Sequence, residues 1–135
     1  MPDTMKPFLF LTAGALFAHA ISPARAAEAV DFQKQVKPLL EANCLSCHGP
    51  EKPKGKLQLD TRAGALKGGD NGSALVPGKP GDSRLYTATV LPADHDDLMP
   101  PANKGGPLSK EHTELLRSWI QQGANWPVNV TLKAV

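Results

Sequence analysis

The stretch Cys44-Leu45-Ser46-Cys47-His48 is the most informative part of the sequence, because it indicates which kind of site the fold contains. Two thiols separated by two residues can each form a thioether with one vinyl group of a haem, and the histidine that follows is placed to bind the iron. This CxxCH spacing is the attachment pattern of a c-type haem. The sequence therefore predicts one covalent haem c, held by Cys44 and Cys47, with His48 as the proximal iron ligand. We expect a backbone carbonyl after Gly49 to accept the other ring N–H of His48 and so to orient the ring.

Two other uses of a CxxC pair fit these residues less well. A dithiol redox site begins a helix that follows a strand, and nothing before Cys44 indicates a strand. A structural zinc ion needs a second pair of ligands at similar spacing, and His95 and His112 are far apart in the chain. Because Cys44 and Cys47 are the chain's two cysteines, a haem that uses both leaves none for a disulfide.

The N-terminus has the parts of a secretory signal peptide. Lys6 precedes an apolar run at residues 8–21, and Ala24-Arg25-Ala26 follows as a small-residue cleavage signal. The run is shorter than the roughly 20 residues that cross a bilayer as a helix, so a membrane anchor is the weaker interpretation. We expect residues 1–26 to be a signal peptide cleaved near Ala26, residues 27–135 to form one domain, and the protein to be periplasmic or otherwise exported.

Charge and aromatic content narrow the class of protein. Lys and Arg number 15 against 13 Asp and Glu, so no basic excess supports a nucleic-acid partner. Lys52, Lys54 and Lys56 form a local basic cluster, which we interpret as a solvated loop, with a docking patch for an acidic redox partner as the alternative. The large aromatic side chains of residues 27–135 are few: Phe32, Tyr86, Trp119 and Trp126. A buried haem would supply the apolar surface that so small a chain lacks.

Two amphipathic helices frame the domain. Asp31 can cap a helix from Phe32 to about Asn43, with either a kink at Pro38 or a new helix that has Pro38 in its first turn. Ser109 can cap a second helix over Lys110–Gln122, ended by Gly123. Trp119 belongs to the apolar stripe of this second helix, where packing against the first helix or the haem edge is favoured over a role as an electron conduit.

The segment between these helices is rich in Gly and Pro and fits a chain wrapped around a cofactor. We expect short helices at Thr61 to about Lys67 and after Asp82 through Val90. Residues 57–59 and 74–76 are candidates for a short ladder of paired strands.

Residues 27–135 contain three candidates for a second, distal iron ligand: Met99, His95 and His112. Met99 is favoured because Pro100 and Pro101 restrict the backbone beside it, and a thioether favours ferrous iron. His95 lies in the acidic run at residues 94–97, which predicts exposure to solvent; the same run is a weaker candidate for a hard cation such as calcium. His112 falls in the first turn of the last helix and is expected to be exposed.

These features resemble class I cytochromes c and, more specifically, the planctomycete-type cytochrome c domain, over about residues 31–127. The motifs that carry the resemblance are Cys47-His48-Gly49-Pro50, Leu57-Gln58-Leu59-Asp60-Thr61-Arg62, Leu66-Lys67-Gly68-Gly69, Val76-Pro77-Gly78-Lys79-Pro80 and Met99-Pro100-Pro101. The resemblance implies a small all-α cytochrome c fold, in which N- and C-terminal helices pack around the haem and the Gly/Pro-rich middle carries short helices. It also implies that His48 is the proximal ligand and Met99 the distal ligand.

The predicted function is that of an exported monohaem electron carrier, not an enzyme, whose iron cycles between Fe(III) and Fe(II) with His48 and Met99 as axial ligands. Its expected partners are redox donor and acceptor proteins, with a membrane-associated oxidoreductase as one candidate, and the carrier is expected to be a monomer. The alternatives are a haem enzyme or a gas or redox sensor with an open or displaceable distal site, and an interaction module that binds no haem.

Overall fold

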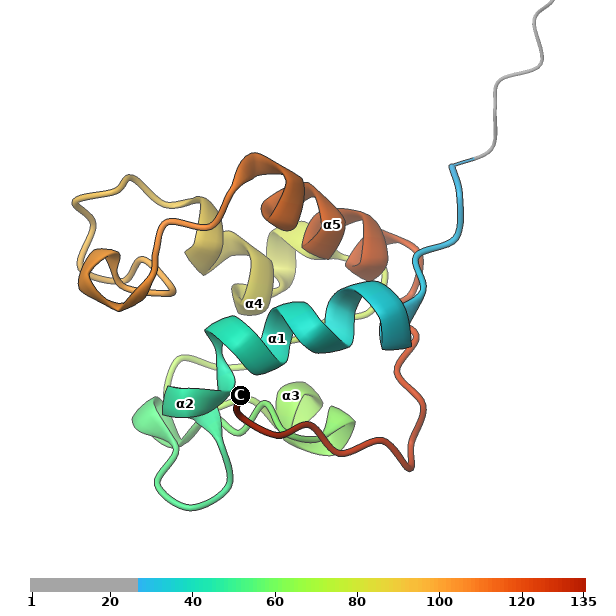
Figure 1. Ribbon diagram of the computed structural model, residues 1–135, viewed down its shortest axis with the longest axis horizontal. Helices are drawn as coiled ribbons and strands as arrows, with labels where there is room; N and C mark the ends of the chain where they lie inside the picture. Colours follow the sequence, from blue (N-terminus) through green and yellow to red (C-terminus); the bar gives the residue numbers. More distant parts are fainter. Residues whose placement is uncertain (1–26) are drawn as a thin grey trace, which may run out of the picture.

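The fold of residues 27–135, which a computed structural model describes, is built from helices (Figure 1). Within these residues no strand forms, apart from one isolated bridge between Gly69 and Gly72, so the predicted all-α class is confirmed. None of the helices in this range is long and apolar enough to cross a membrane. The predicted signal peptide, residues 1–26, lies outside the described residues.

The first helical unit consists of a π-helical turn η1 (Phe32–Val36) and the helix α1 (Lys37–Asn43). Asp31 caps the unit, because its carboxylate accepts the N–H of Lys34 at 3.1 Å. Pro38 lies in the first turn of α1, the position predicted for it in one of the two alternatives. The backbone of Val36 and Lys37 is helical, so η1 continues directly into α1.

The last helix, α5 (Lys110–Gln121), begins at the predicted cap and ends one residue earlier than predicted. The Ser109 hydroxyl accepts the N–H of His112 at 3.2 Å, and Gly123, with a φ of 104°, turns the chain away. The buried face of α5 packs on η1, beside α1 in Figure 1. The ring of Phe32 lies 5.7 Å from that of Trp119 and 4.9 Å from that of Trp126, so these three aromatic side chains form the centre of the core.

The middle segment forms the short helices predicted for it. The helix α3 (Arg62–Lys67) is capped by Thr61, and α4 (Arg84–Thr87) continues into the turn η4 (Ala88–Val90). The remaining elements are single turns: α2 (Leu45–His48), η2 (Lys54–Lys56), η3 (Pro80–Asp82) and η5 (Ala102–Lys104).

The predicted strand pairing of residues 57–59 with residues 74–76 is wrong. The N–H of Leu59 donates to the carbonyl of His48 at 2.8 Å, and the N–H of Leu75 donates to that of Ala65 at 3.2 Å. The N–H of Leu59 is therefore bonded to the cysteine-containing segment and the N–H of Leu75 to α3. Neither N–H is available to pair the two segments as strands.

The C-terminal segment is tied back to the first half of the chain through Glu41 on α1. One carboxylate oxygen of Glu41 accepts the Lys37 ammonium at 2.9 Å, and the other accepts the backbone N–H of Lys133 at 3.0 Å. The neighbouring N–H of Leu132 donates to the Asp60 carbonyl at 2.7 Å. The hydrogen bond from Lys37, followed by that from Lys133, lowers the pKa of Glu41.

Replacing Glu41 with glutamine is expected to remove a pH-dependent part of the stability. A carboxyl whose pKa is lowered by folding stabilises the protein above the pKa of the unfolded chain, and this contribution is lost as the pH falls. The free energy of unfolding of the wild type, measured by denaturant titration, should therefore fall more steeply below about pH 4.5 than that of Glu41→Gln. The control is Glu114→Gln, which removes an exposed pair with Arg117 and should change little. Parallel curves for wild type and Glu41→Gln would contradict this role of the carboxylate.

Candidate haem site

The cysteine pair and His48 lie where the first helical unit ends. Cys44 is the junction between α1 and α2: its N–H donates to Leu40, and its carbonyl accepts the N–H of His48 at 3.0 Å. Both cysteines are free, and Cys44, Cys47 and His48 all line one cavity. The prediction that the first helix delivers this motif at its C-terminal end is confirmed.

The cavity is mostly apolar and far larger than the space of a single water. Its volume is about 210 Å³, whereas a single water needs only about 10–15 Å³ by the same measure. The apolar part of the wall includes Leu57, Leu59, Ala74, Leu85, Ala88 and Pro100. An apolar cavity that opens onto both thiols and an imidazole fits a porphyrin attached through Cys44 and Cys47, with His48 on its iron.

His48 is oriented by the carbonyl of Leu57, which lies 3.2 Å from the ring atom Nδ1. A carbonyl oxygen only accepts hydrogen bonds, so Nδ1 carries the proton and Nε2 keeps the lone pair that an iron would bind. The prediction that a carbonyl beyond Gly49 orients this ring is confirmed. Burial lowers the pKa of His48, which favours the neutral imidazole that serves as a metal ligand.

The segment that supplies the Leu57 carbonyl is held in place by a turn at Gly69. The N–H of Asp70 donates to the carbonyl of Gly55 at 2.8 Å. Gly69 approaches that carbonyl so closely that a Cβ there would overlap it. The sequence indicates a turn at Gly68-Gly69, but it does not show that this turn braces the segment beside His48.

The environment of Cys44 argues against dithiol redox chemistry. Burial, reinforced by the charge of Cys47, raises the pKa of the Cys44 thiol to about 12. Cysteines that exchange disulfides need a lowered pKa, because the thiolate is the reacting form. The Cys44 thiol therefore lacks the lowered pKa that a redox-active dithiol needs.

Of the three candidates for the distal ligand, only Met99 lines this cavity. Its backbone N–H donates to the Ala88 carbonyl at 3.0 Å, and its neighbours Leu98 and Pro100 are buried, so both sides of Met99 are anchored. The side chain of Met99 itself is 37 % exposed. His95 and His112 are both exposed, as predicted, and neither is part of the wall.

The acidic run at residues 94–97 gains no support as a cation site. All four residues are exposed. Over residues 27–135, the structure brings no three His, Cys, Asp or Glu side chains together in a way that could hold a metal ion.

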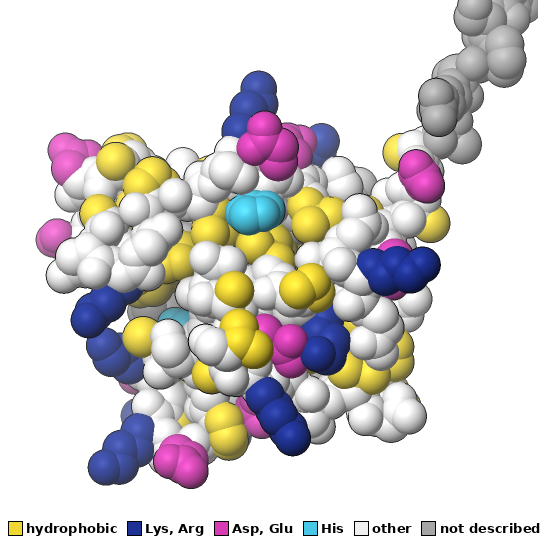
Figure 2. Space-filling model, in the orientation of Figure 1, with side chains coloured by type: hydrophobic (Ala, Val, Ile, Leu, Met, Phe, Trp, Pro, Cys, Tyr) yellow, Lys and Arg dark blue, Asp and Glu magenta, His cyan; other side chains and the backbone are white. Residues whose placement is uncertain are grey.

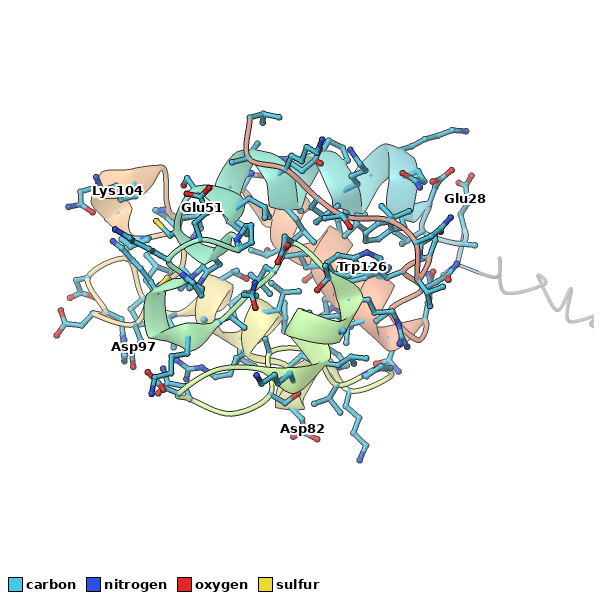
Figure 3. The ribbon with its side chains drawn as sticks, turned by 90° about the horizontal axis from the view of Figure 1, so that it is seen from below. Glu28, Glu51, Asp82, Asp97, Lys104 and Trp126 are labelled. Atoms are coloured by element: carbon cyan, nitrogen blue, oxygen red, sulfur yellow. The ribbon has the colours of Figure 1, made fainter. Side chains whose placement is uncertain are left out.

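Sequence reasoning did not find the basic side chains on the cavity wall. Lys54, Arg84 and Lys104 line it, whereas the sequence predicts Lys54 as part of a solvated loop or, alternatively, of a docking patch for a redox partner. Lys104 and Glu51 both lie toward the same end of the molecule in Figure 3, and Glu28 lies at the opposite end. No sequence signal identifies Arg84 or Lys104, because packing of α4 and η5 places them. On the face shown in Figure 2, basic and acidic side chains are interspersed.

A helical fold that closes an apolar cavity over a CxxCH motif defines a haem-binding protein of the cytochrome c class. Residues 44–103 match the family described as planctomycete cytochrome C. The matched span includes Cys44, Cys47, His48 and Met99, and it confirms over these residues the resemblance to the planctomycete-type cytochrome c domain that was inferred from the sequence. The family implies covalent haem c. No match was found among curated proteins or among solved structures.

Proposed function

We propose that this protein is an exported monohaem electron carrier whose iron is bound by His48 and Met99. The observation that carries the proposal is that Met99 lines the same cavity as His48 and both cysteines. Met99 is the one methionine of residues 27–135, so no second thioether competes for the position. A histidine and methionine pair gives the iron six ligands in both oxidation states, and the potential is raised relative to two histidines.

The residues around the site fit electron transfer better than catalysis on a bound substrate. When bound, the haem supplies one-electron Fe(III)/Fe(II) chemistry. Leu57 orients His48, and the backbone hydrogen bond to Ala88 holds the segment that carries Met99. The apolar wall would exclude water from a bound porphyrin, and Cys44 and Cys47 would hold that porphyrin covalently. We further propose that donor and acceptor proteins exchange electrons at the exposed edge of the haem, and that the carrier acts as a monomer.

The experiment that tests this function is an optical spectrum of oxidised and reduced protein, exported from a host that matures c-type cytochromes. We expect a covalently attached, six-coordinate, low-spin haem with the weak near-infrared band of a sulfur–iron bond. A five-coordinate spectrum, or ready binding of carbon monoxide by the reduced protein, would instead support the enzyme or sensor with an open distal site. Purified protein without haem would support the interaction module.

Gly106 offers a way to disturb Met99 without touching it. A methyl group at Gly106 would overlap the carbonyl oxygen of Pro100, the residue next to Met99. We expect Gly106→Ala to displace this segment, to cost about 1–3 kcal/mol of unfolding free energy and to weaken the near-infrared sulfur–iron band. The matched control is Gly81→Ala, because a Cβ at Gly81 meets no atom within 4 Å. If the two variants have the same spectrum and stability, the segment does not constrain Met99 as proposed.

A further inference from the structure

The guanidinium of Arg84 has no acidic partner in the part of the chain that the structure describes. Arg84 is half-buried on the cavity wall, whereas the other two cations there, Lys54 and Lys104, are exposed. The salt bridges among residues 27–135 involve other basic residues: Lys34, Lys37, Lys56 and Arg117. The one acidic residue on the cavity wall, Asp70, pairs with Lys56 at 3.1 Å.

The backbone that carries Arg84 is fixed by its neighbours. Ser83 is fully buried; its hydroxyl oxygen accepts the N–H of Val76, and its one O–H is shared between the carbonyls of Lys79 at 2.9 Å and Val76 at 3.2 Å. On the other side, the N–H of Leu85 donates to the carbonyl of Ala74 at 2.9 Å. The backbone of Arg84 therefore belongs to a rigid part of the wall, between two buried residues. Little further ordering of this backbone is needed for the side chain to bind an anion.

Filling the cavity with a porphyrin would remove water from Arg84, and a desolvated cation needs an anion to offset the cost. The planar guanidinium matches a carboxylate with two parallel N–H···O bonds, which the ammonium of a lysine cannot reproduce. A haem carries two propionate carboxylates, and its attachment to Cys44 and Cys47 holds it in this cavity. We propose that Arg84 binds a haem propionate and thereby both seats the haem edge and raises the reduction potential. The proposal rests on the haem of the proposed function, but it does not depend on Met99 as the distal ligand.

The test compares haem-loaded Arg84→Gln with the wild type. Loss of a positive charge beside the haem destabilises Fe(II), so we expect the equilibrium to shift about tenfold toward Fe(III), which is a fall of 59 mV for one electron. The propionate carboxylate bands in the reduced-minus-oxidised infrared spectrum, identified with haem labelled by ¹³C at those carboxyls, should also shift. Arg84→Lys keeps the charge and should restore most of the potential while leaving the carboxylate bands altered.

The matched control is Arg62→Gln. Arg62 is also a half-buried arginine at the start of a short helix, α3, but it does not line the cavity. It should change neither the potential nor the carboxylate bands. Unaltered carboxylate bands in Arg84→Gln, with or without a change in potential, would overturn the proposal, and so would an equal effect of Arg62→Gln. The sulfur–iron band of the same samples reports on Met99 separately, so failure of the distal-ligand proposal would be seen independently of the result for Arg84.

Discussion

Replacing Met99 with alanine is expected to lower the reduction potential by on the order of 0.1 V, the largest functional effect of any single substitution on the cavity wall apart from the haem-attaching residues. Axial ligands set haem potentials over a range of about 0.8 V, and loss of a thioether removes the ligand that favours ferrous iron. The near-infrared sulfur–iron band should disappear, and the reduced protein should bind carbon monoxide. Covalent attachment through Cys44 and Cys47 keeps the haem in the variant, so potentiometric titration and optical spectra can be compared directly with the wild type.

A control for this experiment is Val90→Ala, an exposed apolar residue that does not line the cavity. It should leave the potential and the spectrum unchanged. If Met99→Ala behaves like Val90→Ala, the distal ligand is not Met99. The next residue to test would then be His95, which would have to move from its exposed position to reach the iron.

Replacing Trp119 with alanine is expected to lower the free energy of unfolding of the haem-loaded protein by about 3–5 kcal/mol. Trp119 is 1 % exposed, packs against Phe32 and Trp126, and donates its indole N–H to the carbonyl of Asn125 at 2.9 Å. Alanine would leave a cavity at the centre of the core and an unpaired carbonyl. Denaturant titration followed by circular dichroism measures the loss.

Two further variants separate packing from the other roles that Trp119 could have. Trp119→Phe keeps most of the ring and loses the indole N–H, so it should cost clearly less than alanine, and Val128→Ala, at a side chain that is 90 % exposed, should cost almost nothing. Trp119 does not line the cavity, so the reduction potential of Trp119→Phe should match the wild type. A stable Trp119→Phe protein with much slower electron transfer to the same partner would favour the electron-conduit interpretation.

The parts of the fold that the sequence predicts well are those set by local signals. Asp31 and Ser109 each hydrogen-bond to the N–H three residues later, as helix caps do. Pro38 marks a helix start because it lacks an N–H, and Gly123 marks a helix end because it takes a positive φ. The CxxCH motif is also local, so its position at the end of the first helical unit was predictable.

The features that escaped prediction depend on contacts between segments distant in the sequence. Residues 57–59 alternate apolar and polar side chains as a strand does, but the N–H of Leu59 donates to the carbonyl of His48. Arg84 gives no sequence signal, because its place on the cavity wall follows from how α4 packs. Met99 could be proposed by elimination among three candidates, whereas its place on the wall beside His48 required the structure.

The hydrogen bond from His48 to Leu57 gives the proposed iron ligand a support that lies outside the CxxCH helix. The carbonyl belongs to a surface segment, and that segment is fastened to the turn at Gly69 through Asp70 and Gly55. The orientation of the His48 ring therefore depends on two loops and not on α2 alone. A side chain at Gly69 would displace the segment that supplies the Leu57 carbonyl and would therefore change the orientation of His48. For this reason Gly69, which has no side chain to bind a haem, should tolerate substitution as poorly as the proposed ligands do.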